Sequence, residues 1–221
     1  IDTDSVPIYA VNVYIPHAGR ANPGAEGTLE ELKWVVRQFP ASAMVILLGD
    51  FNGRLGRSHN FTGKSGVRED PGGVTGEWSV HDSDNEQGKL VRQMAEDLNL
   101  IAVSTFYRPR AKRGGAGTFQ PYGDKKEFAI ANLDYVFMSK RWRTSCLSVK
   151  ARWGPSEHRF CSGNGVRKDH ALLLVKLRMR LTKAEKVSRP DRKFWNPVLV
   201  VNVTIACLVL MSVTMFSIAK A

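Results

Sequence analysis

Cysteine is scarce in this chain, and this excludes two ways of stabilising a fold. The 221 residues include three cysteines, and Cys146, Cys161 and Cys207 are widely spaced. An odd count at this spacing predicts neither a disulfide framework nor a zinc-binding domain. His158 and Cys161 have the spacing of half a metal site, but no second pair accompanies them, and structural zinc needs four ligands. We therefore expect a reducing, intracellular location, with the nucleus as one option.

Acidic residues are outnumbered by basic ones. Asp and Glu total 21, Lys and Arg total 32, and the formal net charge is +11. Such an excess raises the local affinity for polyanions and speeds their encounter with the protein. A basic surface that only keeps the protein soluble is the alternative. We favour binding of a polyanion over that alternative.

The sequence shows no internal repeat and no signal peptide, and it begins with Ile1 instead of Met. We therefore expect a fragment whose natural beginning is absent. Apolar residues make up 43% of the sequence, which is enough for a sizeable core and excludes wholesale disorder. The length suits one domain with some residues left over at the end.

Helical and strand patterns alternate along most of the chain. Two helices are predicted, at residues 28–39, where Thr28 and Glu31 have capping-box spacing, and at residues 86–99. Residues 53–76 are rich in glycine and charge and are predicted to form a loop. Strands are predicted at residues 8–14, 44–48, 101–104, 118–120, 133–138, 147–152 and 173–181, the last with clean apolar–polar alternation. Interleaved helices and strands favour an α/β sandwich.

The last part of the chain differs from the rest. After a domain that we place at residues 1–182, residues 183–197 form a basic linker. Residues 198–219 then contain no charged side chain, and a helix of that length would span a bilayer as a membrane anchor. The basic linker would keep the domain on the cytoplasmic side of that membrane. The alternative is an artefact of gene prediction, such as a shifted reading frame after the real domain.

Three short motifs place carboxylates where phosphodiester chemistry needs them. Cleavage requires an activated water and stabilisation of extra negative charge, which a His steered by a carboxylate and a carboxylate-bound cation can provide. Asp50 and Asn52 follow an apolar strand and can project from its end toward one cleft. Asp134 lies within an apolar strand, where a carboxylate is costly unless a group such as His pairs with it. Asp169 and His170 directly precede the last apolar strand. Taken alone, each motif also fits an ordinary turn, strand start or loop end.

Together the three motifs resemble the endonuclease/exonuclease/phosphatase superfamily. Gly-Asp-Phe-Asn at 49–52, Leu-Asp-Tyr-Val-Phe at 133–137 and Asp-His at 169–170 occur in that family's order. Val13–Gly19 resembles the family's tyrosine strand and following loop, and Thr118–Phe119 resembles a pair that often precedes the Leu-Asp-Tyr strand. Members include abasic-site endonucleases, endonuclease domains of long interspersed retroelements, deoxyribonuclease I-like enzymes and inositol-phosphate phosphatases. The resemblance implies a two-sheet α/β sandwich of the deoxyribonuclease I-like type, with the active site at one edge, where loops of both sheets meet.

The resemblance also implies a role for each motif residue. His170 would contact the scissile phosphate and activate water, and Asp134 would hold His170 in the right orientation. Asn52 would hydrogen-bond a phosphate oxygen, and Tyr14 would help to stabilise the developing charge. Asp50 would act in proton transfer and lie close to the metal.

The metal that the resemblance implies is Mg²⁺, or Mn²⁺ in its place, with Asp169 and Asp50 as ligands. Two features depart from the family's pattern. His17 stands where nucleic-acid repair members often have Asn. The family's early Asn and its metal-binding Glu lie on strands upstream of the Tyr14 strand, whereas only seven residues precede Ile8 and none is Glu. We therefore expect the first strands to be missing, and the chain as given to be weakly active or inactive.

Charge favours nucleic acid over inositol phosphates as the substrate. Residues 108–115 form a basic, flexible loop, and residues 141–143 and 152–153 combine cations with aromatic rings that suit backbone contact and stacking. For Trp142 and Trp153 we favour the alternative of packing on a sheet. The leading hypothesis is a metal-dependent DNA endonuclease of retroelement or abasic-site type. The alternatives are a phosphatase acting on small or lipid-linked phosphate esters, which a hydrophobic tail would suit, and a non-catalytic polyanion-binding remnant.

Overall fold

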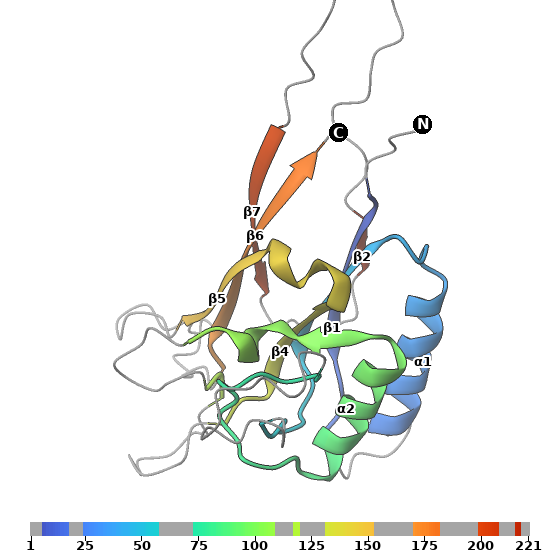
Figure 1. Cartoon of the computed structure of the whole chain (residues 1–221). Helices are drawn as coiled ribbons and strands as arrows, with labels where there is room; N and C mark the ends of the chain where they lie inside the picture. Colours follow the sequence, from blue (N-terminus) through green and yellow to red (C-terminus); the bar gives the residue numbers. More distant parts are fainter. Residues whose placement is uncertain are drawn as a thin grey trace, which may run out of the picture.

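In the residues that it describes, the computed structural model of the chain forms two β-sheets with two α-helices (Figure 1). It describes residues 6–17, 24–57, 73–108, 117–119, 131–152, 170–181, 199–207 and 215–217. The elements are β1 (Ile8–Tyr14), α1 (Ala25–Arg37), β2 (Met44–Asp50), α2 (Glu86–Asp97), β3 (Leu100–Ala102), η1 (Val103–Phe106), β4 (Asp134–Ser139), η2 (Lys140–Ser145), β5 (Cys146–Arg152), β6 (Leu172–Leu181), β7 (Leu199–Cys207) and β8 (Met215–Ser217).

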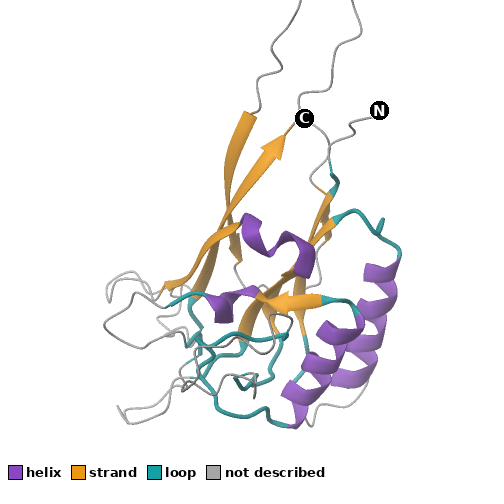
Figure 2. Cartoon of the chain, viewed as in Figure 1, coloured by secondary structure: helices purple, strands orange, loops and turns teal. Residues whose placement is uncertain are grey.

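The larger sheet has five strands in the order β3-β4-β2-β1-β8, and the smaller sheet has three in the order β5-β6-β7. Strands β1 and β2 are parallel, because α1 carries the chain back between them, and every other pairing is antiparallel. Helices α1 and α2 lie on one side of the larger sheet and the smaller sheet on the other (Figure 2). This is a two-sheet α/β sandwich, as the resemblance implied.

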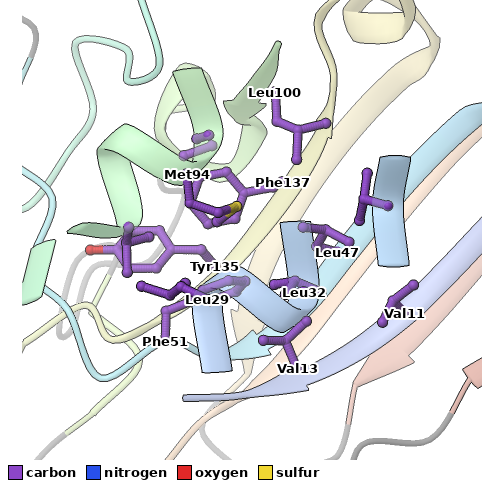
Figure 3. Packing of buried hydrophobic residues seen from close by; sticks show 14 of the residues in the cluster. Val11, Val13, Leu29, Leu32, Leu47, Phe51, Met94, Leu100, Tyr135 and Phe137 are labelled. Carbon is purple, nitrogen blue, oxygen red and sulfur yellow. The ribbon is translucent and has the colours of Figure 1, made fainter. Parts of the chain in front are cut away.

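The first core lies between the two helices and the larger sheet (Figure 3). Leu29 and Leu32 of α1 and Met94 of α2 pack there against Leu47 and Phe137 of the central strands. Both helices were predicted from their apolar spacing, and α2 begins as expected. Burial of these side chains fixes which face of each helix meets the sheet.

The predicted capping box on the first helix is wrong. Helix α1 begins at Ala25 with Gly24 as its N-cap, so Thr28 lies inside the first turn. The Thr28 hydroxyl donates to the Gly24 carbonyl four residues earlier instead of capping the helix. Ala25 and Glu26 are compatible with helix, and Glu26 also suits the positive end of the helix dipole, so the helix extends one turn further than the Thr-Glu spacing predicted.

The second core lies between the two sheets. Ile46, Leu48 and Val136 from the larger sheet meet Leu173 and Val175 from the smaller one. The alternation predicted for the last strand of the domain is present in the described side chains: those that face the larger sheet are buried, and Lys176 and Arg178 between them are exposed. Because strand side chains alternate, the residues at even positions on β2 and β4 point into this inter-sheet core.

Two other predicted strands are shorter than expected. β3 ends at Ala102, and residues 103–106 form the 3-10 turn η1. At Thr118 and Phe119 the chain makes isolated bridges rather than a strand, pairing Phe119 with Ala131 and His170. In η1, Thr105 accepts hydrogen bonds from the N–H groups of Gly76 and Trp78. Apolar periodicity does not record contacts of this kind.

The hydrophobic C-terminal segment contributes strands in this structure. β7 pairs with β6 over nine positions, and β8 pairs with β1 over three. In the portion of the chain that the structure describes, no helix is long and apolar enough to cross a membrane. β-branched residues are frequent in β7, which favours a strand over a helix when a partner edge is available. The predicted linker at 183–197 lies outside the described residues.

Candidate active site

Three neighbouring strands of the larger sheet carry polar side chains at the same edge of the sheet. Tyr14 on β1 is the register partner of Asp50 on β2, and Asp50 is the register partner of Asp134 on β4. On their strands the two carboxylates stand two positions from Leu48 and Val136, which belong to the inter-sheet core. Side chains two positions apart share a face of a sheet. The larger sheet therefore brings two carboxylates to one edge of the space between the sheets, with a tyrosine beside them.

His170 reaches these carboxylates from the smaller sheet, where it directly precedes Ala171 and β6. Its Nδ1 lies 2.9 Å from Asp134 Oδ2, and its Nε2 lies 4.0 Å from Asp50 Oδ2. The Asp134 side chain is 2% exposed and the His170 side chain 25% exposed. When Nδ1–H donates to the buried carboxylate, the ring presents Nε2 toward Asp50 and solvent. The structure thus brings together the three side chains to which the motifs assigned proton chemistry.

Thr118 and Phe119 hold both members of the His–Asp pair. The Thr118 hydroxyl accepts hydrogen bonds from the backbone N–H groups of Leu133, at 3.2 Å, and of Asp134, at 3.0 Å. The Thr118 carbonyl accepts the N–H of Ala171 at 2.7 Å. The Phe119 ring stands 4.9 Å from the His170 ring at an interplanar angle of 54°. A two-residue segment therefore links the start of β4 to the start of β6.

Asn52 is tied to the end of β1 and to Asp50. Its backbone adopts a φ of +49°, and its N–H donates to Asp50 Oδ1 at 2.9 Å. Its side-chain Nδ2 donates to the Ile15 carbonyl at 2.9 Å, while the N–H of Ile15 donates to the Asp50 carbonyl at 2.8 Å. An amide carries two N–H donors, so a side chain anchored in this way can still donate to a ligand. The loop after β2 is held beside the strand that carries Tyr14.

Gln87 was missed by sequence reasoning. It lies in the first turn of α2, is 5% exposed, and donates from Nε2 to the carbonyls of Pro16, at 3.1 Å, and Phe51, at 2.8 Å. These carbonyls follow the ends of β1 and β2, so one side chain ties both strand ends together. A polar residue on the buried face of a helix was the available signal.

His81 and Tyr135 were also missed, and both act on the segment that leads into β4. His81 Nε2 accepts the N–H of Asn132 at 3.1 Å. The Tyr135 hydroxyl donates to the Asn132 carbonyl at 2.8 Å and accepts the N–H of Leu55 at 2.9 Å. Burial raises the pKa of Tyr135, so its hydroxyl stays protonated as a donor. Long-range contacts of this kind leave no local sequence pattern.

Comparison with known proteins gives relatives that are longer than this chain. Craniofacial development protein 2 from Bos taurus is 25% identical over 182 residues, which cover 82% of this chain and 26% of that protein. The protein of the same name from Tragulus javanicus is 26% identical over 163 residues, which cover 74% of this chain and 24% of that protein. The chain thus spans about a quarter of the length of these curated relatives. No family model matches it.

Solved nuclease structures align with part of the chain. The 3′ phosphatase NExo from Neisseria, bound to a product DNA hairpin, is 16% identical with a TM-score of 0.48, and the match covers 76% of this chain and 60% of that one. An AP endonuclease from Archaeoglobus fulgidus is 16% identical with a TM-score of 0.45, covering 75% of this chain and 60% of that one.

The chain resembles the endonuclease/exonuclease/phosphatase superfamily. The order of its motifs and its two-sheet architecture agree with this resemblance.

The metal that the superfamily implies can be tested against the residues in place. Asp50 offers carboxylate oxygens, the ligand type that Mg²⁺ prefers. However, the described portion of the chain holds no group of three or more His, Cys, Asp or Glu side chains that could hold a metal ion. Asp169, the other expected ligand, lies outside the described residues, so no step through a metal follows from the geometry.

The predicted cation–aromatic segment at 141–143 lies away from this candidate site, whereas Arg152, at the end of β5, is the register partner of Leu172, two residues after His170. β4 starts at Asp134 and ends at Ser139, and η2, with Arg141 and Trp142, follows its far end. The Arg141 guanidinium lies 5.3 Å from the Trp142 ring centroid, and Trp142 packs against the inter-sheet core, as we favoured for this residue. Of the basic loop at 108–115, only Arg108 falls within the described residues. The second predicted tryptophan, at 153, lies outside them.

Proposed function

We propose that this chain is a metal-dependent phosphodiester hydrolase acting on nucleic acid, and specifically a DNA endonuclease of the retroelement or abasic-site type. The observation that carries the proposal is the buried Asp134 carboxylate bonded to His170, whose other ring nitrogen faces Asp50 at 4.0 Å. A buried carboxylate that orients a partly exposed imidazole is an arrangement for moving protons at a substrate. A DNA substrate is consistent with an intracellular location, of which the nucleus is one option.

Each residue of the site has a task in this proposal. His170 Nε2 takes a proton from the attacking water, while Asp134 holds the ring and stabilises its protonated form. Asp50 takes part in proton transfer beside the ring. The amide of Asn52 and the hydroxyl of Tyr14 donate hydrogen bonds to phosphate oxygens as negative charge develops there. Mg²⁺ or Mn²⁺, held by Asp50 and Asp169, would neutralise that charge.

Electrostatics support a polyanionic substrate at this edge of the sheets. The loop that follows Asp50 and Asn52 carries the exposed side chains Arg54 and Arg57. The net charge of +11 adds long-range attraction for nucleic acid. Contacts of cationic side chains with phosphates position a duplex without reading its sequence. The proposal therefore leaves base recognition to groups other than these arginines.

The experiment measures nicking of supercoiled plasmid by the full chain in Mg²⁺, in Mn²⁺ and in excess chelator. We expect weak, cation-dependent nicking that falls by roughly a hundredfold or more in His170→Ala, because the general base is lost. Lys176→Ala is the matched control, since it removes one exposed charge from β6, the strand that follows His170. Nicking that persists in His170→Ala would show that the assigned site is wrong.

Two other activities are distinguishable in the same assay series. A phosphatase would release inorganic phosphate from small phosphate esters without nicking plasmid. A non-catalytic remnant would bind DNA in a salt-dependent way with no turnover under any cation. Either result would replace the endonuclease proposal.

A further inference from the structure

The start of β4 is held by side chains in addition to its pairing with β2. Three successive backbone N–H groups, those of Asn132, Leu133 and Asp134, each donate to a side-chain acceptor. Thr118 Oγ1 receives the second and third, at 3.2 and 3.0 Å, and His81 Nε2 receives the first at 3.1 Å. The position of the Asp134 carboxylate therefore depends on two side chains that lie outside β4.

The backbone of His81 is fixed by the loop that follows β2. His81 forms a bridge with Gly56, and its carbonyl accepts the N–H of Arg57 at 2.9 Å. Asp84, three residues later, accepts the N–H of Gly56 at 2.6 Å and pairs with Arg92 of α2 through two hydrogen bonds of 2.6 and 2.8 Å. The backbone of His81 is thus attached to the loop that follows β2, the strand that ends in Asp50. The His81 ring contacts the segment that leads to Asp134.

We propose that His81 is a positioning residue that holds the start of β4, and with it the Asp134 carboxylate, only while its imidazole is neutral. The inference deepens the proposed hydrolase, on whose site it rests. An imidazole nitrogen accepts a hydrogen bond only when it carries no proton, and a protonated ring has two donors and no acceptor. Protonation of His81 would set its Nε2–H against the N–H of Asn132 and break this attachment.

The surroundings of His81 keep the ring neutral at physiological pH. Partial burial lowers the pKa of His81, and the nearby Arg54 guanidinium from the loop after β2 lowers it further. Asp82, on the same loop as His81, opposes this, but its carboxylate also faces Arg57 Nε at 3.6 Å. Because the pKa in the folded protein lies below that of the unfolded chain, the bond's stabilisation is fully present above about pH 6.5. It is lost as pH falls through the folded value.

Two variants separate the acceptor from the ring. His81→Phe keeps a flat ring of similar size but has no acceptor nitrogen. His81→Gln places a carbonyl oxygen at about the reach of Nε2 and cannot be protonated in this pH range. If the acceptor is what matters, the glutamine variant behaves like the wild type near neutral pH and the phenylalanine variant does not.

The first readout is NMR of the full chain labelled at Asn and His, which requires no activity. In the wild type we expect His81 to carry its proton on Nδ1, and the Asn132 amide and the His170 ring to shift with the midpoint of His81 titration. In His81→Gln this change in the chemical shifts of the Asn132 amide and the His170 ring should disappear. An Asn132 amide and a His170 ring that do not respond when His81 titrates would overturn the proposal.

The second readout is the pH profile of kcat for nicking. We expect His81→Phe to lower kcat by roughly ten- to a hundredfold with little change in KM, as loss of a supporting hydrogen bond commonly does. His81→Gln should restore kcat and remove one acid-side step. Equal rates in the two variants would contradict the inference. A wild type that does not nick DNA would refute the proposed function, and the NMR titration would still decide the role of His81.

Discussion

The Asp134 carboxylate illustrates how one residue sets the local chemistry. Its side chain is 2% exposed, and removing a carboxylate from water is costly without a partner. The His170 ring supplies that compensation through Nδ1, which lies 2.9 Å from Asp134 Oδ2, so charge and position are fixed together. The exposed side of the same imidazole can then exchange protons with a substrate.

Gly49 makes a prediction at the same scale. Its φ is +147°, and a Cβ at this position would lie 1.9 Å from the Val13 carbonyl oxygen of the neighbouring strand. Gly49→Ala should therefore cost roughly 3 kcal/mol in the free energy of unfolding, through backbone strain and steric overlap. Urea unfolding followed by circular dichroism measures this.

The matched control for that substitution is Gly24→Ala. Gly24 precedes α1, and a Cβ there would meet nothing within 4 Å. Its cost should stay near 1 kcal/mol or below, the usual effect of Ala at a helix N-cap. Equal losses for the two substitutions would show that the close approach to Val13 is relieved by a small shift of the strands.

At the scale of helices and strands, apolar periodicity predicted the features that depend on burying one face of an element. The apolar spacing of α1 and α2 and the alternation on β6 appear as expected, because each buries one face. The ends were less predictable: the N-cap at Gly24 depends on backbone angles, and the bridges at Phe119 depend on contacts with His170. The candidate site was likewise predicted in part. Motifs identified Asp50, Asp134 and His170, whereas the supporting side chains lie on elements that only tertiary folding brings near.

Replacing Gln87 tests whether one side chain holds the ends of β1 and β2 together. Gln87→Met keeps the length of the side chain but removes both donors to the Pro16 and Phe51 carbonyls. Leaving buried acceptors unsatisfied should lower the free energy of unfolding by about 2 kcal/mol. Hydrogen exchange at Asn52 and Tyr14 should also accelerate, because the two strand ends lose their common anchor.

Gln93→Ala is the control on the same helix. Gln93 is exposed and donates to Asp97 on the surface of α2. Its loss should change the free energy of unfolding by no more than about 0.5 kcal/mol. If Gln87→Met is equally mild, and exchange at the strand ends is unchanged, Gln87 does not hold the site together.

For the whole molecule, the two sheets share one core and meet at the candidate site. Sequence patterns predicted this sandwich, because strands that bury one face need a second layer. They did not predict strands in the hydrophobic C-terminal segment, because a long uncharged run satisfies the length rule for a membrane helix and the sequence alone does not show an available sheet edge.

Truncation decides between these two roles of the C-terminal segment. β7 pairs with β6 over nine positions and β8 pairs with β1 over three, so a chain ending at residue 198 would leave both edges without these partners. Exposed strand edges template pairing with other chains, so this variant should aggregate and unfold at a lower temperature than the full chain. A chain ending at residue 217 keeps both strands and is the control. Light scattering and thermal unfolding in buffer without detergent measure the outcome. A membrane anchor makes the opposite prediction: the chain ending at 198 would be the more soluble of the two, and its unfolding temperature would not fall.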